Sequence, residues 1–227
     1  MTRGAIIVCG GRSKRMGRDK TTLPFGPEVL LQRIVRTLGQ IIAPSDMVVV
    51  AAEGQVLPPL PPEIRVVTDR RPDRGPLEAL SVGFGELRPD IEAAFVTGCD
   101  FPLLTTPFVR RLFELLGQAE IAVPNDGARR HCLTTVYRPQ VLPTIDRLLS
   151  ANCLKVQDLL ALCVCRDVSP DELRDVDPNL HSLLNINTPE QYQAALALAD
   201  LPRAGRPDGG AGPSGSALTS PTDEPGR

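Results

Sequence analysis

The chain has 227 residues, with 25 basic and 27 acidic side chains and a formal net charge of −2. This balance argues against a nucleic-acid surface, because duplex binding usually leaves a basic footprint. With no tryptophan, two tyrosines and six phenylalanines, stacking platforms for single strands are scarce. No apolar stretch approaches the ~20 residues of a membrane helix, and no signal-peptide pattern is present. We therefore expect a cytoplasmic protein whose partners include neither a nucleic acid nor a membrane.

The cysteines give no sign of a metal site. They include no C-x-x-C pair, and the chain has only two histidines, so a zinc site is not expected. Free thiols in a reducing cytoplasm, packed as small apolar side chains, are the expected state. The six cysteines are Cys9, Cys99, Cys132, Cys153, Cys163 and Cys165.

Short β-branched runs alternate with helical patterns over the first half of the chain. Strands are predicted at residues 5–8, 47–51, 64–68, 93–97 and 121–123. These runs are apolar throughout, as expected for strands buried on both faces. Helices are predicted between them at residues 30–40, 77–87 and 106–117; in the first, apolar positions recur every three or four residues. This alternation predicts a parallel sheet wrapped by helices.

After Pro124 the pattern is looser. It predicts strands at residues 133–137 and 163–168 and helices at residues 140–149 and 156–162. A last helix begins where Thr188 can cap it and Pro189 can take its first turn, and it should end near Asp200. Residues 1–202 are thus predicted to form a single α/β domain, an open, mostly parallel sheet with helices on both faces.

Residues 203–227 differ in composition from the rest of the chain. They contain six glycines, four prolines and a single large apolar side chain, Leu218. Such a segment buries too little apolar surface to offset the entropy of ordering it. We predict a disordered tail, without the charge block or amphipathic stripe that would favour a docking role.

Chemistry-bearing residues follow several of the predicted strands. In open α/β sheets, ligands bind beyond the carboxyl ends of the strands. Asp69 and Asp100 follow the third and fourth strands, and Asp100 is suited to hold Mg²⁺ between phosphate oxygens. The first strand runs into glycines and cations, namely Gly10, Gly11, Arg12, Lys14, Arg15, Gly17, Arg18 and Lys20. Glycine backbone can approach phosphate closely and donate its N–H groups.

Each of these features also has an ordinary explanation. Paired glycines after a strand often form only a turn, a cationic loop is often a solvated surface, and a strand-end aspartate often caps a turn. The spacing matches neither the G-x-x-x-x-G-K-[ST] phosphate loop nor the G-x-G-x-x-G dinucleotide pattern. Their convergence at one edge of the sheet nevertheless favours a site for a phosphorylated ligand.

Four segments carry a resemblance to a known family. VCGGRSKRMGRDK at residues 8–20 resembles the L-A-G-G-x-S-x-R-M-G-x-D-K signature of molybdenum cofactor guanylyltransferases. Further likenesses follow in the family's order: TDR at residues 68–70 with GPL at 75–77, TGCDFP at 97–102, and NINTPE at 185–190. The resemblance covers residues 4 to 199. It implies a Rossmann-like fold of the nucleotidyltransferase type and transfer of GMP from GTP to the phosphate of molybdopterin, the molybdenum cofactor.

The resemblance also implies roles for particular residues. Arg15, Lys20 and Asp100 would be catalytic, with Asp100 the Mg²⁺ ligand. Binding of the nucleotide or the pterin is implied for Cys9, Gly10, Gly11, Lys20, Asp69, Asp100, Asn185 and Asn187. For Asn185 and Asn187, a turn and cap before the last helix is an equally open explanation. The implied partners are GTP, molybdopterin and, transiently, the molybdoenzymes or chaperones that receive the product.

The chain departs from the family pattern at three places. Cys9 replaces the usual Ala, Cys132 replaces the Pro of an H-P-L loop, and Ala51-Ala52-Glu53 follows the second strand where the family often has a base-reading Asn. A cytidylyltransferase acting on the same pterin, another small-molecule nucleotidyltransferase and a non-catalytic nucleotide-binding protein therefore stay open as alternatives. A cysteine hydrolase using His131 and Cys132 is a further, less favoured one.

Overall fold

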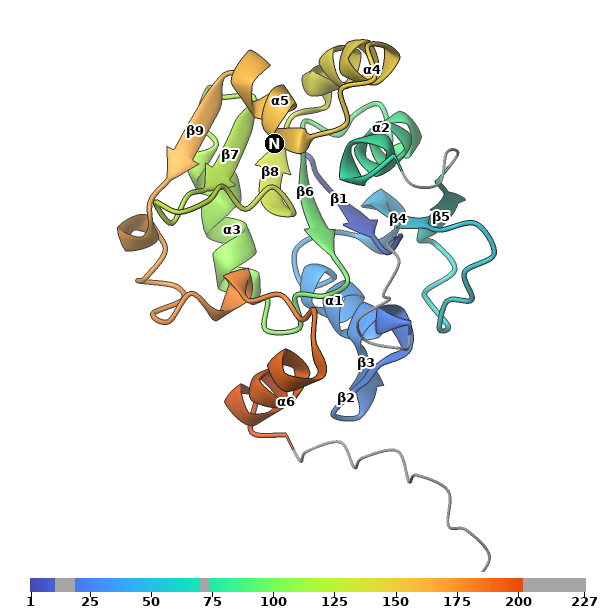
Figure 1. Cartoon of the computed structure of the whole chain (residues 1–227), viewed down its shortest axis with the longest axis vertical. Helices are drawn as coiled ribbons and strands as arrows, with labels where there is room; N and C mark the ends of the chain where they lie inside the picture. Colours follow the sequence, from blue (N-terminus) through green and yellow to red (C-terminus); the bar gives the residue numbers. More distant parts are fainter. Residues whose placement is uncertain (11–18, 70–73, 202–227) are drawn as a thin grey trace, which may run out of the picture.

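The structure, a computed structural model, describes residues 1–10, 19–69 and 74–201 (Figure 1). Gly11, Arg15 and the predicted tail at residues 203–227 lie outside the described residues. Within these ranges, no helix is long and apolar enough to cross a membrane.

A central sheet organises the molecule. The described residues place seven strands in it, in the order β5-β4-β1-β6-β8-β7-β9. Only β8 runs antiparallel to its neighbours among these described strands. The strands are β1 Arg3–Val8, β4 Met47–Ala51, β5 Arg65–Thr68, β6 Ala93–Gly98, β7 Ile121–Pro124, β8 Thr134–Tyr137 and β9 Cys165–Val168. The predicted open, mostly parallel sheet is confirmed.

The central strands are buried on both faces because successive side chains point to opposite sides of the sheet. Ile7 of β1 packs in one apolar core and Ile6 in the other, and both are fully buried. The strand β5 was expected to be buried in the same way, and this expectation is wrong. Three of its four residues are exposed, and Val66 is 50% exposed, because β5 lies at the edge of the sheet.

Helices cover both faces of the sheet (Figure 1). On one face, α1 Leu30–Leu38 and α3 Thr106–Leu115 contribute to the core that contains Ile7. On the other face lie α2 Pro76–Glu86, α4 Leu142–Ser150 and α5 Val156–Leu162. The helix predicted at residues 140–149 begins only at Leu142, because the preceding residues Pro139–Val141 form a 3₁₀ turn.

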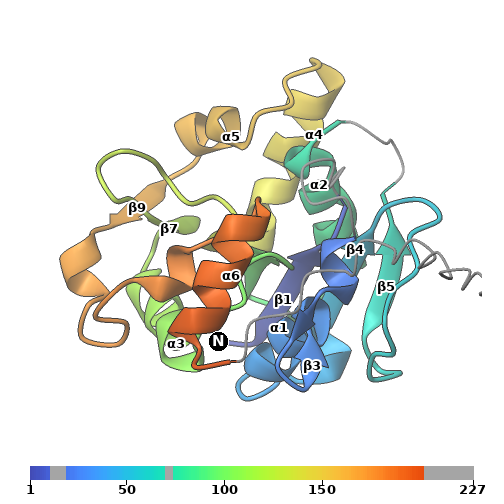
Figure 2. The same ribbon diagram turned by 60° about the horizontal axis from the view of Figure 1, so that its bottom comes forward.

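A third, smaller core lies at the carboxyl end of the central strands. It joins α6 Pro189–Leu198 to a hairpin of β2 Pro24–Phe25 and β3 Glu28–Val29, and Figures 1 and 2 show these elements next to one another. The hairpin was not predicted from the sequence. Thr188 caps α6 by accepting a hydrogen bond from the Gln191 backbone N–H, as predicted. This packing brings the segment before α6 to the edge of the sheet where the predicted site lies.

Candidate nucleotide site

Lys20 joins three segments that are far apart in the sequence. Its Nζ donates to Asp100 Oδ2 at 3.0 Å and to Asn187 Oδ1 at 2.9 Å. The Lys20 and Asp100 side chains are only 15% and 19% exposed. The structure therefore brings together three of the predicted site residues, one from each of three separate motifs.

Local hydrogen bonds explain why these segments meet. Asp19 caps the short 3₁₀ turn Lys20–Thr22 by accepting from the Thr21 backbone N–H at 2.9 Å and from its hydroxyl at 2.7 Å. At the end of β6, the Asp100 carbonyl accepts from the Ile186 N–H at 2.9 Å, which ties the segment before α6 to the sheet. The Asp19 side chain thus holds the turn that begins at Lys20, and a backbone hydrogen bond holds the residue before Asn187.

Gly98 makes room for the Asp100 carboxylate. A Cβ on Gly98 would lie 2.4 Å from Asp100 Oδ1, closer than real Cβ atoms come to an oxygen. The carboxylate thus folds back over the end of β6 and occupies the space that a larger residue would fill.

The oxygens of Asp100 and Asn187 suit a hard divalent cation. Asp100 Oδ1 accepts no hydrogen bond from the part of the chain that the structure describes, while Oδ2 faces Lys20. Among the same described residues, no three or more His, Cys, Asp or Glu side chains lie together in a group that could hold a metal ion by themselves. One carboxylate and one amide oxygen are a donor set that Mg²⁺ can use together with substrate phosphates. The residues present therefore fit the predicted metal.

Cys9 lies at the end of β1 with its side chain turned into the core. Its N–H donates to the Val50 carbonyl at 2.8 Å, and its thiol is buried beside Cys99. A hydrogen bond with Cys99, and then burial, raise the pKa of the Cys9 thiol well above its usual range. Any contact of Cys9 with a nucleotide is therefore made by its backbone. Gly10 follows Cys9 and lies beside Ala52. A Cβ added to Gly10 would be 3.7 Å from the Ala52 backbone nitrogen.

Asp69 continues the ladder between β5 and β4. Its N–H donates to the Ala51 carbonyl at 2.8 Å, one residue beyond the end of β5. Asp69 therefore lies at the same carboxyl edge of the sheet as Cys9 and Asp100, as predicted.

Asn185 lies in a second part of the site. It lines a pocket of about 430 Å³ rather than bonding to Lys20. The pocket is lined by Pro76, Phe101, Arg129, Arg130, His131, Cys132, Leu133, Leu154, Lys155, Val156, Gln157 and Asn185. Its cations come from the loop after β7 and from the residue before α5. No role was assigned to Arg129 or Lys155 from the sequence, because the likeness to the H-P-L loop lies just after Arg129 and no motif marks Lys155.

His131 and Cys132 do not form a nucleophile and base. His131 Nε2 faces Asp126 Oδ2 at 2.8 Å, and the Cys132 thiol donates to the Arg130 carbonyl at 3.6 Å. Burial raises the pKa of the Cys132 thiol, whereas a nucleophilic cysteine needs a lowered pKa. These contacts argue against the cysteine hydrolase.

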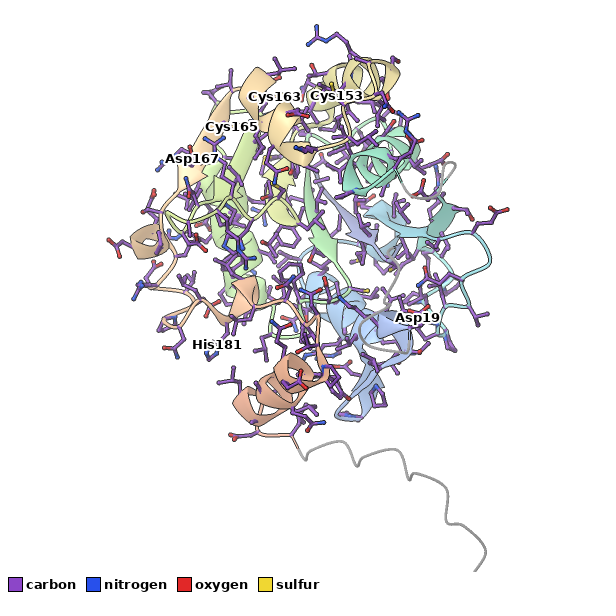
Figure 3. All side chains as sticks on the ribbon, viewed as in Figure 1. Asp19, Cys153, Cys163, Cys165, Asp167 and His181 are labelled. Carbon is purple, nitrogen blue, oxygen red and sulfur yellow. The ribbon has the colours of Figure 1, made fainter. Side chains whose placement is uncertain are left out.

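The remaining cysteines lie away from the site. All six cysteines are free in the structure. Figure 3 shows Cys153, Cys163 and Cys165 together at the opposite end of the molecule from Asp19. They pack against the core on the α2 face of the sheet.

Comparisons with known proteins agree with the motifs. Residues 5–166 match the family model described as the MobA-like NTP transferase domain. The chain is 38% identical over 196 residues to the probable molybdenum cofactor guanylyltransferase of Mycobacterium tuberculosis strain H37Rv, which covers 84% of this chain and 92% of that relative.

Solved structures share the fold. Molybdopterin-guanine dinucleotide biosynthesis protein A from Archaeoglobus fulgidus matches with a TM-score of 0.71 at 17% identity, over 88% of this chain and 99% of that one. Rv0371c from Mycobacterium tuberculosis H37Rv, solved in complex with manganese, matches with a TM-score of 0.60 at 15% identity, over 87% and 99%. The predicted Rossmann-like fold is confirmed. The chain belongs to the MobA-like NTP transferase family and is an enzyme of the nucleotidyltransferase class, as its motifs predict.

Proposed function

We propose that the protein transfers GMP from GTP to the terminal phosphate of molybdopterin, which releases pyrophosphate. The observation that carries this proposal is the contact of Lys20 with both Asp100 and Asn187 at the carboxyl edge of the sheet. The 38% identity to probable molybdenum cofactor guanylyltransferases supports the choice of substrates.

The reaction needs charge neutralisation more than acid–base chemistry. A phosphate monoester has a second pKa of about 6, so the attacking phosphate is largely ionised at neutral pH. No general base is then required, and alignment and electrostatic stabilisation supply most of the catalysis. Lys20 is proposed to stabilise negative charge on the phosphates, and Arg15, which lies outside the described residues, is proposed to do the same.

The donor set at the edge of the sheet supports magnesium as the metal. Asp100 and Asn187 would hold Mg²⁺, which supplies charge neutralisation on the triphosphate when bound. Lys20 already bonds both residues, so it lies next to the same oxygens and adds its own positive charge there. Cys9, Gly10 and Gly11 are proposed to contact the nucleotide through their backbone, and Asp69 its nucleoside part.

The pocket at Asn185 is proposed to receive the acceptor. It lies beside Phe101, the residue that follows Asp100, so an occupant would be adjacent to the proposed metal ligand. Arg129 and Lys155 offer positive charge to a phosphate, and Gln157 and Asn185 offer amide groups to a heterocycle. An anionic, hydrogen-bonding pterin phosphate matches this lining.

Guanine rather than cytosine is proposed because of the GPL segment at residues 75–77. Gly75 has a φ of +75°, which favours glycine, and Pro76 begins α2 directly after it.

The product is proposed to pass to molybdoenzymes or their chaperones in the cytoplasm.

The test is to incubate the full chain with molybdopterin, Mg²⁺ and each nucleoside triphosphate in turn, and to measure pyrophosphate. Release with GTP alone is the expected result. Release with CTP and not GTP would replace the guanine assignment by a cytidylyltransferase. GTP binding without release in any mixture would favour a non-catalytic nucleotide-binding protein.

A further inference from the structure

Gln55 connects three segments at the nucleotide edge of the sheet through one side chain. Its Nε2 donates to Asp19 Oδ2 at 2.8 Å, to Asp19 Oδ1 at 3.1 Å and to the Cys9 carbonyl at 3.3 Å. Its Oε1 accepts from the Ala52 backbone N–H at 2.9 Å. The side chain thus binds the end of β1, the start of the loop after β4 and the residue before Lys20. No motif in the sequence marks it.

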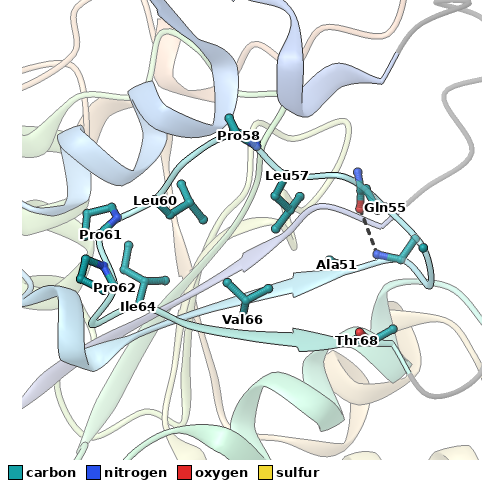
Figure 4. Close-up of a pocket in the computed structure, with 12 residues that line it drawn as sticks. Ala51, Gln55, Leu57, Pro58, Leu60, Pro61, Pro62, Ile64, Val66 and Thr68 are labelled. Atoms are coloured by element: carbon teal, nitrogen blue, oxygen red, sulfur yellow. Dashed lines mark hydrogen bonds between the residues drawn. The ribbon is translucent and has the colours of Figure 1, made fainter.

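The loop that carries Gln55 arches over the edge of the sheet. Figure 4 shows it above β4 and β5, with Gln55 at the carboxyl end of the strands, where its oxygen accepts a hydrogen bond from the Ala52 backbone N–H. Beneath the loop is a pocket of about 420 Å³ that is lined mostly by apolar residues. At its other end, Gln32 of α1 donates to the Pro59 carbonyl at 3.0 Å. Two glutamines therefore anchor one loop, and only Gln55 reaches the nucleotide site.

The contact between Gln55 and Asp19 does more than close a local turn. The bond to Ala52 spans three residues, but the bonds to Cys9 and Asp19 span 46 and 36 residues. Asp19 in turn caps the turn that starts at Lys20. The amide nitrogen of Gln55 carries two N–H groups, and it lies within hydrogen-bond distance of both carboxylate oxygens of Asp19. The Asp19 carboxylate is therefore held from two sides, by the amide of Gln55 and by Thr21.

We propose that Gln55 is a positioning residue that holds Asp19, and through it the Lys20 turn, in the orientation that directs the Lys20 ammonium to Asp100 and Asn187. The inference rests on the proposed function, since Lys20 acts there on the phosphates. Gln55 itself does not touch the reacting atoms. It fixes the residue that carries the charge, as outer partners fix the ligands of metal sites, where their loss costs 10- to 100-fold.

The first test compares two alanine variants of the full chain. Gln55→Ala is expected to lower kcat for pyrophosphate release about tenfold and to weaken GTP binding, measured by calorimetry without acceptor, by a similar factor. The KM for molybdopterin should stay within about twofold, since the acceptor pocket contains no residue of this loop. Gln32→Ala loosens the same loop at its far end and should leave kcat and GTP binding within about twofold of wild type.

A polarity exchange separates positioning from a general structural role. Gln55→Glu places a second carboxylate against Asp19 and should lower kcat more than Gln55→Ala does, with partial recovery as the pH falls and one carboxylate takes a proton. When Asp19→Asn is added to Gln55→Glu, position 19 carries the amide donor and position 55 the carboxylate acceptor. The hydrogen bond can then form in the opposite direction, and kcat should recover to within about threefold of wild type. Thermal unfolding of each variant checks that the fold is retained.

Each outcome bears on the proposal in a defined way. Equal kcat and GTP affinity for Gln55→Ala and wild type would overturn it, as would the same loss in Gln32→Ala or no recovery in the double variant. Absence of turnover in the wild-type protein counts against the proposed function instead, and the comparison of GTP affinities then still decides whether Gln55 positions the Lys20 turn.

Discussion

The ammonium group of Lys20 donates to Asp100 Oδ2 at 3.0 Å, although the two residues lie 80 positions apart in the sequence. Both side chains are largely buried, at 15% and 19% exposed, so water screens the pair less than it would on the surface. Asn187 accepts from the same ammonium group. A cation, a carboxylate and an amide oxygen are thus held together before a substrate arrives, which is the condition for electrostatic stabilisation without reorganisation.

Asp100→Asn is expected to abolish most turnover while leaving the fold intact. The substitution removes the charge that pairs with Lys20 and that is proposed to hold Mg²⁺, and the loss of one such electrostatic group costs on the order of 10²- to 10³-fold in kcat. The Asp100 carbonyl still accepts from Ile186, so the segment before α6 stays attached. Pyrophosphate release measures the effect. Asp90→Asn, an exposed partner of Arg88, is the matched control and should keep wild-type turnover.

Asn187→Ala should lower turnover less than Asp100→Asn. Lys20 loses one acceptor but keeps its ion pair with Asp100, so a decrease in kcat on the order of tenfold is expected. Asn179→Ala, at an exposed position, is the control. If Asn187 served only as a turn and cap before α6, Asn187→Ala and Asn179→Ala would both match wild type in kcat. The two variants would then differ only in melting temperature.

Much of the central sheet could be predicted because its strands are continuous β-branched runs. The strand β4 was predicted with its observed bounds, and β1 differed only at its start. The hairpin of β2 and β3 was missed, because strands of two residues are too short to show an alternation of apolar and polar side chains. The exposure of β5 was also missed, since whether a strand lies at an edge depends on the order of strands and not on its own composition.

The sequence named candidate site residues but gave no sign of the contacts between them. The motif around Asp100 was visible in the sequence, whereas the approach of Asn187 to Lys20 spans 167 residues and depends on the packing of α6 against the β2–β3 hairpin. Gln55 could not have been found, because its role arises from the path of the loop after β4. The departure from the family pattern at residues 51–53 pointed to this loop, but it did not show that Gln55 is the residue whose side chain contacts Asp19.

Asp126→Asn should make stability less sensitive to acid. The pKa of Asp126 is lowered from 3.8 to about 2, first by the hydrogen bond from His131 and then by the backbone N–H groups of Arg129 and Ala128. Above about pH 5 the folded and unfolded carboxyls are both ionised, and the stabilisation is fully present. It is lost as the pH falls toward 2, because the unfolded chain takes up a proton first.

Urea unfolding between pH 2 and 5 measures this effect. The free energy of unfolding of Asp126→Asn should fall less steeply with decreasing pH than that of wild type. Asp171→Asn, at a side chain that is 95% exposed, is the control and should follow the wild-type slope. A variant at Asp126 with the wild-type slope would contradict the prediction.

Two glycines of α2 should respond in opposite directions to the same substitution. A Cβ on Gly83 would lie 2.5 Å from Ile6 Cγ2, and Ile6 is fully buried in β1 with a β-branched side chain that cannot turn away. Gly83→Ala should therefore destabilise the protein by about 1–3 kcal/mol through overpacking. A Cβ on Gly85 meets no described atom within 4 Å, so Gly85→Ala should stabilise it by about 0.5–1 kcal/mol through helix propensity. Chemical denaturation of both variants decides the matter: an unchanged or raised stability of Gly83→Ala would mean that the contact between α2 and β1 does not limit the size of residue 83.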